Sequence, residues 1–199
     1  MMDGTRRSFD LEAIRADFPI LSREVHGKPL VYLDSAASAQ KPAQVLDALM
    51  SAYQDTYANV HRGLHFLSEA STDLYEAVRG KVAGFIGAAS GDEIVLTSGA
   101  TMSLNLIARC WAQPRLQPGD EILISIAEHH ANIVPWQMVA EATGARVRAF
   151  TLEDDGAFSM ARLKAEMSER TRIISVPHVS NVLGTVFPVA KIAELAHDA

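Results

Sequence analysis

The chain has 199 residues, of which 48% are apolar and 21% are charged, a balance typical of a soluble globular protein with a sizeable core. Lys plus Arg number 18 against 24 for Asp plus Glu, so the formal net charge is -6. This acidic balance argues against a general nucleic-acid binder, which needs a basic face to contact phosphates.

The single cysteine, Cys110, excludes an intrachain disulfide and suits a reducing compartment. Residues 1–10 are polar and no apolar run follows them, so neither a signal peptide nor a membrane-spanning helix is expected. These features predict a cytoplasmic protein without membrane partners.

Short β-branched runs alternate with helical patterns along the chain. Ordered along the sequence, the periodicity predicts strands at 30–33, 93–97, 121–126, 146–150 and 172–176, and helices at 42–57, 68–86, 101–111, 134–143, 160–167 and 189–197. Apolar strands alternating with helices indicate βαβ units, and therefore an α/β fold with a mostly parallel sheet. Ligands of such sheets gather at the carboxyl ends of the strands.

The first polar cluster follows the predicted strand 93–97 and opens a predicted helix. Its sequence is Ser98-Gly99-Ala100-Thr101. Backbone N–H groups at the helix start and the two hydroxyls could hold a phosphate, and glycine would allow close approach. An ordinary strand-to-helix turn with a Ser or Thr cap fits the same residues. Neither a Walker loop nor a dinucleotide fingerprint is present.

The second cluster, Glu128-His129-His130-Ala131-Asn132, follows the predicted strand 121–126. A histidine here could act as a base or stack its flat ring on a cofactor, and a hydrogen-bonded loop histidine is the alternative. No metal site is expected, because adjacent histidines diverge and no second cysteine or acidic cluster lies nearby.

Two further segments are less specific. Residues 177–184, after the predicted strand 172–176, could orient a ligand oxygen or could simply form a turn. His61 and Arg62 lie between two predicted helices, where they could reach a site or belong to a surface loop. Cys110 falls in an apolar helical run, which favours a buried small side chain over a nucleophile.

Four segments together resemble the Suf-type cysteine desulfurases, in the class V aminotransferase-like branch of the fold-type I pyridoxal-phosphate enzymes. They are LDSAASAQKP (33–42), NVHRG (59–63), EHHANIVPWQ (128–137) and HVSNVLG (178–184). The resemblance extends from about Phe18 to the end of the chain. It implies that residues 1–30 would join the small domain, and that 31–199 form the first part of the cofactor-binding large domain, incomplete at the C-terminus.

The resemblance also implies a role for each matching residue. His129 would stack on the pyridine ring of pyridoxal 5'-phosphate and assist proton transfer, and Asn181 would hydrogen-bond the phenolic oxygen. Ala100 and Thr101 would hold the phosphate. His61 and Arg62 match a segment near the active site and the dimer interface.

The implied reaction takes sulfur from L-cysteine, leaving alanine and an enzyme-bound persulfide. In the family, a sulfur-acceptor protein of the Suf system receives that sulfur for iron–sulfur cluster assembly, and the enzyme is a homodimer. The family's pyridinium-pairing Asp, Schiff-base Lys, sulfur-accepting Cys and substrate-binding Arg would lie beyond Ala199, so the 199-residue chain alone is expected to be inactive.

One departure and three alternatives remain. Many Suf-type members have Arg-Gly-Thr-Thr-Glu where this chain has Ser98-Gly99-Ala100-Thr101-Met102, and Met102 in place of an acidic residue is unexplained. The alternatives are a selenocysteine lyase or another class V pyridoxal-phosphate enzyme, a non-catalytic fragment, and an unrelated nucleotide-binding α/β domain.

Overall fold

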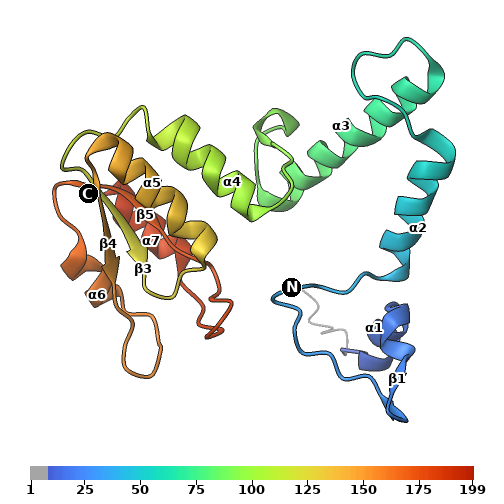
Figure 1. Cartoon of the computed structure of the whole chain (residues 1–199), viewed down its shortest axis with the longest axis horizontal. Helices are drawn as coiled ribbons and strands as arrows, with labels where there is room; N and C mark the ends of the chain where they lie inside the picture. The colour runs from blue at the N-terminus through green and yellow to red at the C-terminus, as the bar shows by residue number, and fades with distance from the viewer. Residues whose placement is uncertain (1–8) are drawn as a thin grey trace, which may run out of the picture. The chain divides into compact units, whose positions relative to one another are not determined.

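The structure is a computed structural model that describes residues 9–199. The chain divides into two compact units, one up to Val95 and one from Leu96 onward (Figure 1). Each unit is a separate body with its own elements.

The first unit is mainly helical. Asp10 caps its first helix by accepting a hydrogen bond from the Ala13 N–H at 3.0 Å, and the long helix α3 ends at Gly87 in a left-handed conformation. The elements are α1 (Leu11–Ala16), η1 (Pro19–Ser22), the antiparallel pair β1 (Glu24–Val25) and β2 (Lys28–Pro29), α2 (Ala43–Ser51), η2 (Ala52–Thr56), α3 (Phe66–Ile86) and η3 (Gly91–Glu93).

The second unit contains a parallel sheet with the strand order β4-β3-β5. A helix connects each strand to the next, as parallel pairing requires. The elements are α4 (Ala100–Leu106), η4 (Ile107–Ala112), β3 (Glu121–Ser125), η5 (His130–Asn132), α5 (Val134–Thr143), β4 (Arg146–Phe150), α6 (Met160–Glu166), β5 (Thr171–Ser175) and α7 (Val189–His197).

The central strand β3 is buried on both faces, which explains its continuous apolar sequence. Successive side chains of a strand point to opposite faces, so Ile122 and Ile124 pack against α5 and η4, whereas Leu123 packs toward α6 and α7. The first cluster comprises Ala108, Ala112, Leu116, Ile122, Ile124, Trp136, Val139, Ala140 and Ala145. The second comprises Leu123, Phe150, Leu152, Leu163, Phe187 and Ile192.

The predicted α/β class and parallel sheet are confirmed. Helices α5 and α7 and strand β4 have the predicted bounds. Strand β3 ends one residue before its predicted end, and β5 begins and ends one residue before its predicted bounds. The hairpin formed by β1 and β2 and the short helix α1 were not predicted. In the described residues, no helix has the length and apolarity needed to cross a bilayer.

Two strand predictions are wrong. Residues 30–33 and 93–97 form no ladder with any strand among residues 9–199, and Glu93 belongs to the short helix η3. Without a partner strand several of their apolar side chains are exposed, to 92% at Leu33 and 74% at Val95, whereas Ile94 is buried. The expectation of a buried Cys110 is also wrong, because this residue is exposed. Its neighbours Ala108 and Ala112 occupy the core-facing side of η4, and Cys110 lies between them on the opposite side.

Candidate functional site

A cavity of about 310 Å³ lies in the second unit, where the loop after β3 meets helix α4. This volume is at the lower end of the range for small-molecule sites. Its lining residues are Thr101, Asn105, His129, His130, Ala131, Val134 and Pro135. Two predicted site residues, Thr101 and His129, are therefore brought together although they come from different elements.

The His129 side chain is fixed by the turn that follows it. The Ala131 N–H donates to His129 Nδ1 at 3.1 Å, and the Asn132 N–H donates to the His129 carbonyl at 2.8 Å. Because Nδ1 accepts a hydrogen bond, the neutral imidazole carries its proton on Nε2. The ring is exposed and meets His130 edge to face, with centroids 6.3 Å apart.

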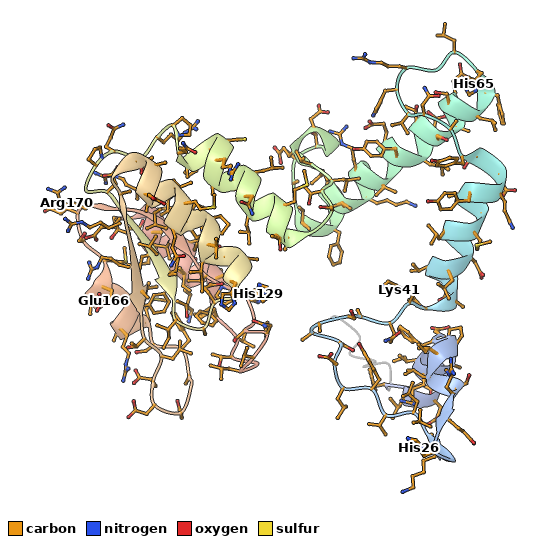
Figure 2. The ribbon with its side chains drawn as sticks, in the orientation of Figure 1. His26, Lys41, His65, His129, Glu166 and Arg170 are labelled. Atoms are coloured by element: carbon orange, nitrogen blue, oxygen red, sulfur yellow. The ribbon has the colours of Figure 1, made fainter. Side chains whose placement is uncertain are left out.

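His129 lies at the carboxyl end of the sheet. Figure 2 shows it beside the start of α5, whereas Arg170, which precedes β5, lies at the other end of the strands. This is the end at which parallel sheets bind ligands. The sequence-based placement of His129 at a strand end is thus observed.

The turn before α4 is held by Thr97. Its hydroxyl donates to the Gly99 carbonyl at 3.1 Å and lies 2.8 Å from the Ser103 hydroxyl. Gly99 has φ 150°, a conformation that side-chain-bearing residues rarely adopt. Ala100 and Thr101 form the first turn of the helix, which continues through η4 to Ala112. Their N–H groups begin the helix, where an anion is favoured.

Met102 follows in the same turn and is about half exposed. Its sulfur accepts a hydrogen bond from the Ser98 hydroxyl at 3.4 Å. Nothing in the structure explains why this residue replaces an acidic one.

A buried hydrogen-bond network lies beneath the His129 turn. Asn132, which is 7% exposed, accepts through Oδ1 from Trp136 Nε1 at 2.8 Å and from the Ser175 hydroxyl at 2.7 Å. Burial raises the pKa of the Glu128 carboxyl above its usual value. The Glu128 Oε1 atom is buried and has no hydrogen-bond partner among residues 9–199.

The loop after β5 carries Asn181. Ser180 is buried, and its hydroxyl donates to the Ala127 carbonyl at 3.4 Å, which ties this loop to the loop after β3. Val179 and Val186 form an antiparallel bridge that closes the loop. Asn181 itself is exposed and does not line the cavity formed by Thr101 and His129. Of the three polar clusters that follow predicted strands, two therefore contribute residues to this cavity, through Thr101 and His129.

His61 and Arg62 belong to the first unit, and both are exposed. His61 has φ 69°, an uncommon conformation for a residue with a side chain. Its N–H donates to the Thr72 hydroxyl at 2.9 Å, its ring meets Tyr75 edge to face, and its Nε2 lies 3.7 Å from Glu76 Oε1. These contacts hold the backbone that precedes Arg62.

Clusters of three or more His, Cys, Asp or Glu side chains arranged to hold a metal are absent from the part of the chain that the structure describes. Glu128 and Asn132 flank the His129 turn, although the sequence gave neither of them a role. Their only signal was membership of the segment Glu128-His129-His130-Ala131-Asn132, because the partners of Asn132 lie on α5 and β5.

The chain is similar to several proteins named cysteine desulfurase. One from Enterobacter sp. (strain 638) is 51% identical over 192 residues, which are 96% of this chain and 47% of that protein. A probable cysteine desulfurase from Synechocystis sp. is 52% identical over 186 residues, 94% of this chain and 44% of that protein. The chain thus spans about half the length of the curated relatives it matches.

Solved structures of cysteine desulfurases are also similar to this chain. A cysteine desulfurase from Escherichia coli matches 96% of this chain and 46% of its own, with a TM-score of 0.81 and 42% identity. The apo structure of a cysteine desulfurase from Thermococcus onnurineus NA1 matches 94% of this chain and 45% of its own, with a TM-score of 0.85 and 34% identity. The family model described as aminotransferase class-V matches residues 31–199. The chain therefore belongs to the aminotransferase class-V family.

Proposed function

We propose that this chain is the cofactor-binding part of a pyridoxal-phosphate-dependent cysteine desulfurase of the Suf type. The observation that carries the proposal is the cavity shared by Thr101 and His129, in a chain about 50% identical to cysteine desulfurases. The Thr101 hydroxyl at the helix start suits the phosphate of a phosphorylated aromatic ligand, and the exposed His129 imidazole suits its ring. Bound there, pyridoxal phosphate supplies an electron sink for a carbanion at the substrate.

Within that proposal, each end of the cavity has its own task. Ala100 and Thr101 hold the phosphate through their N–H groups and the Thr101 hydroxyl. His129 stacks on the cofactor ring. Because its Nδ1 accepts the Ala131 N–H, Nε2 is the atom that holds and exchanges a proton. Asn181 binds the phenolic oxygen of the cofactor, from a loop that Ser180 anchors to Ala127.

The remaining parts of the proposal concern the whole protein. Its substrate is L-cysteine, its acceptor is a sulfur-acceptor protein of the Suf system, and it acts as a cytoplasmic homodimer. Residues 1–30, of which 1–8 lie outside the described residues, join the small domain, and 31–199 form the first part of the large domain. His61 and Arg62 lie near the active site and the dimer interface. The positive φ of His61, 69°, supports a functional role for this segment, because such costly backbone conformations cluster at functional sites.

The test measures alanine released from L-cysteine by the full-length protein that contains this chain, with pyridoxal phosphate added. His129→Gln should lower the rate by about 100-fold or more, the scale of general acid–base catalysis. His197→Gln, at the end of α7, is the matched control and should keep the rate. Equal rates for the two variants would refute the role of His129.

The same assay separates the alternatives. A protein that binds pyridoxal phosphate but releases alanine only from selenocysteine is a selenocysteine lyase. One that binds the cofactor and acts on neither amino acid is another class V enzyme. Absence of cofactor binding together with tight nucleotide binding would support an unrelated nucleotide-binding domain. Absence of both would support a non-catalytic chain.

A further inference from the structure

The cavity beside α4 has two walls of different chemistry. The loop after β3 contributes the imidazole-bearing residues His129 and His130, whereas α4 contributes Thr101, which carries a hydroxyl, and Asn105, which carries an amide. Thr101 and Asn105 are four positions apart, so they lie on the same face of the helix. The sequence gave Asn105 no role, because its place in the cavity depends on the packing of α4 against η5.

The amide of Asn105 is fixed in orientation by its own helix. Its Nδ2 atom donates to the Thr101 carbonyl oxygen at 2.8 Å. A carbonyl oxygen only accepts hydrogen bonds, so the nitrogen of the amide and not its oxygen faces Thr101. Side chains of a helix lean toward its N-terminus, which agrees with this contact one turn back along α4. The amide is therefore held beside Thr101.

One donor of this amide remains available to a bound molecule. The amide nitrogen carries two N–H groups, and the hydrogen bond to the Thr101 carbonyl uses one of them. In the part of the chain that the structure describes, the second N–H has no hydrogen-bond partner. Asn105 is half-buried and lines the cavity, where water competes less for a donor than at an open surface.

The cavity has little else with which to hold an anion on its α4 wall. Among residues 9–199, no Lys or Arg side chain lines it. An anionic group there depends on neutral donors, and a hydrogen bond from such a donor to a charged acceptor is stronger than one between two neutral groups. Each neutral donor on this wall therefore matters for binding.

We propose that Asn105 is a further contact residue of the cavity, and that its second amide N–H donates to the phosphate of the bound molecule. The identity of that phosphate rests on the proposed function. The orientation of the amide does not, because the Thr101 carbonyl fixes it without any ligand.

The test compares two probes that differ only in the phosphate, pyridoxal phosphate and pyridoxal. Isothermal titration calorimetry measures the Kd of each for the cofactor-free form of the full-length protein that contains this chain. The probes share the ring and the aldehyde, so the ratio of their Kd values isolates the phosphate. Asn105→Ala should raise the Kd for pyridoxal phosphate about tenfold, the scale of one hydrogen bond to a charged group, and leave the Kd for pyridoxal within about twofold.

Asn105→Asp is a second variant, which keeps the proposal falsifiable if Asn105→Ala fails to fold. It removes the donor and adds a negative charge, so it should raise the Kd for pyridoxal phosphate by more than about tenfold. The matched control is Gln113→Glu, the same exchange of an amide for a carboxylate, at the C-cap of η4 and outside the cavity. It should leave both Kd values within about twofold. Melting followed by circular dichroism checks that each variant is folded.

The outcomes separate this inference from the proposed function. A loss confined to pyridoxal phosphate in the Asn105 variants supports the contact. An equal loss of both probes would mean that Asn105 has only a structural role, and unchanged Kd values would also overturn the contact while leaving the proposed function intact. A wild-type protein that binds pyridoxal as tightly as pyridoxal phosphate would overturn the proposed phosphate site, and the Asn105 contact with it.

Discussion

Phe187 closes the Asn181 loop, and its removal should destabilise the second unit strongly. Its side chain is fully buried, its ring centroid lies 5.1 Å from that of Phe158, and its N–H donates to the His178 carbonyl at 2.8 Å. Truncation of a buried phenylalanine to alanine costs about 3–5 kcal/mol. Because domains have total stabilities of about 5–15 kcal/mol, Phe187→Ala should remove a large part of the free energy of unfolding.

The assay is urea unfolding followed by tryptophan fluorescence, because both tryptophans of the chain, Trp111 and Trp136, belong to the second unit. Val182→Ala lies in the same loop at 80% exposure and is the matched control. It should change the free energy of unfolding by no more than about 0.5 kcal/mol. A loss below about 1 kcal/mol for Phe187→Ala would refute the reasoning that this side chain anchors the loop.

Three further predictions concern single residues. Hydrogen bonding from Ser168 lowers the pKa of Glu121 below 4.5, so its contribution to stability is present above that value and is lost as pH falls through the lowered folded pKa. Ser168→Ala should therefore make the urea midpoint of unfolding fall less steeply as the pH is lowered. An unchanged pH dependence of the midpoint would contradict this role of the Ser168 hydroxyl. Gly99→Ala should cost roughly 1–3 kcal/mol, because residues with a side chain rarely adopt φ 150°, and should weaken binding of pyridoxal phosphate in a fluorescence titration. A variant with wild-type stability would show that the turn relaxes freely. Ser159 caps α6, because its hydroxyl accepts a hydrogen bond from the Arg162 N–H at 3.4 Å. Ser159→Ala should therefore lower the free energy of unfolding by about 0.5–2 kcal/mol. No measurable loss would mean that this hydrogen bond does not stabilise the helix.

The amino-acid sequence alone determined the elements whose signal is local. The bounds of α5, α7 and β4 follow from periodicity, Pro135 in the first turn of α5 and Gly144 at its end, all of which act within a few residues. The position of His129 directly after an apolar run placed it at a strand end. The family segments were also readable, because they are contiguous runs of residues.

Only the tertiary structure decided which distant residues meet. Asn132 and Ser175 are 43 positions apart, and Ser168 and Glu121 are 47 apart, yet each pair is hydrogen-bonded. Strand pairing is decided in the same way, since residues 94–97 have a strand-like sequence but find no partner among residues 9–199. Cys110 is exposed because the core lies on the opposite side of η4. Periodicity describes one segment at a time, whereas a ladder, a buried network or a cavity depends on which segments pack together, and that is a property of the folded chain.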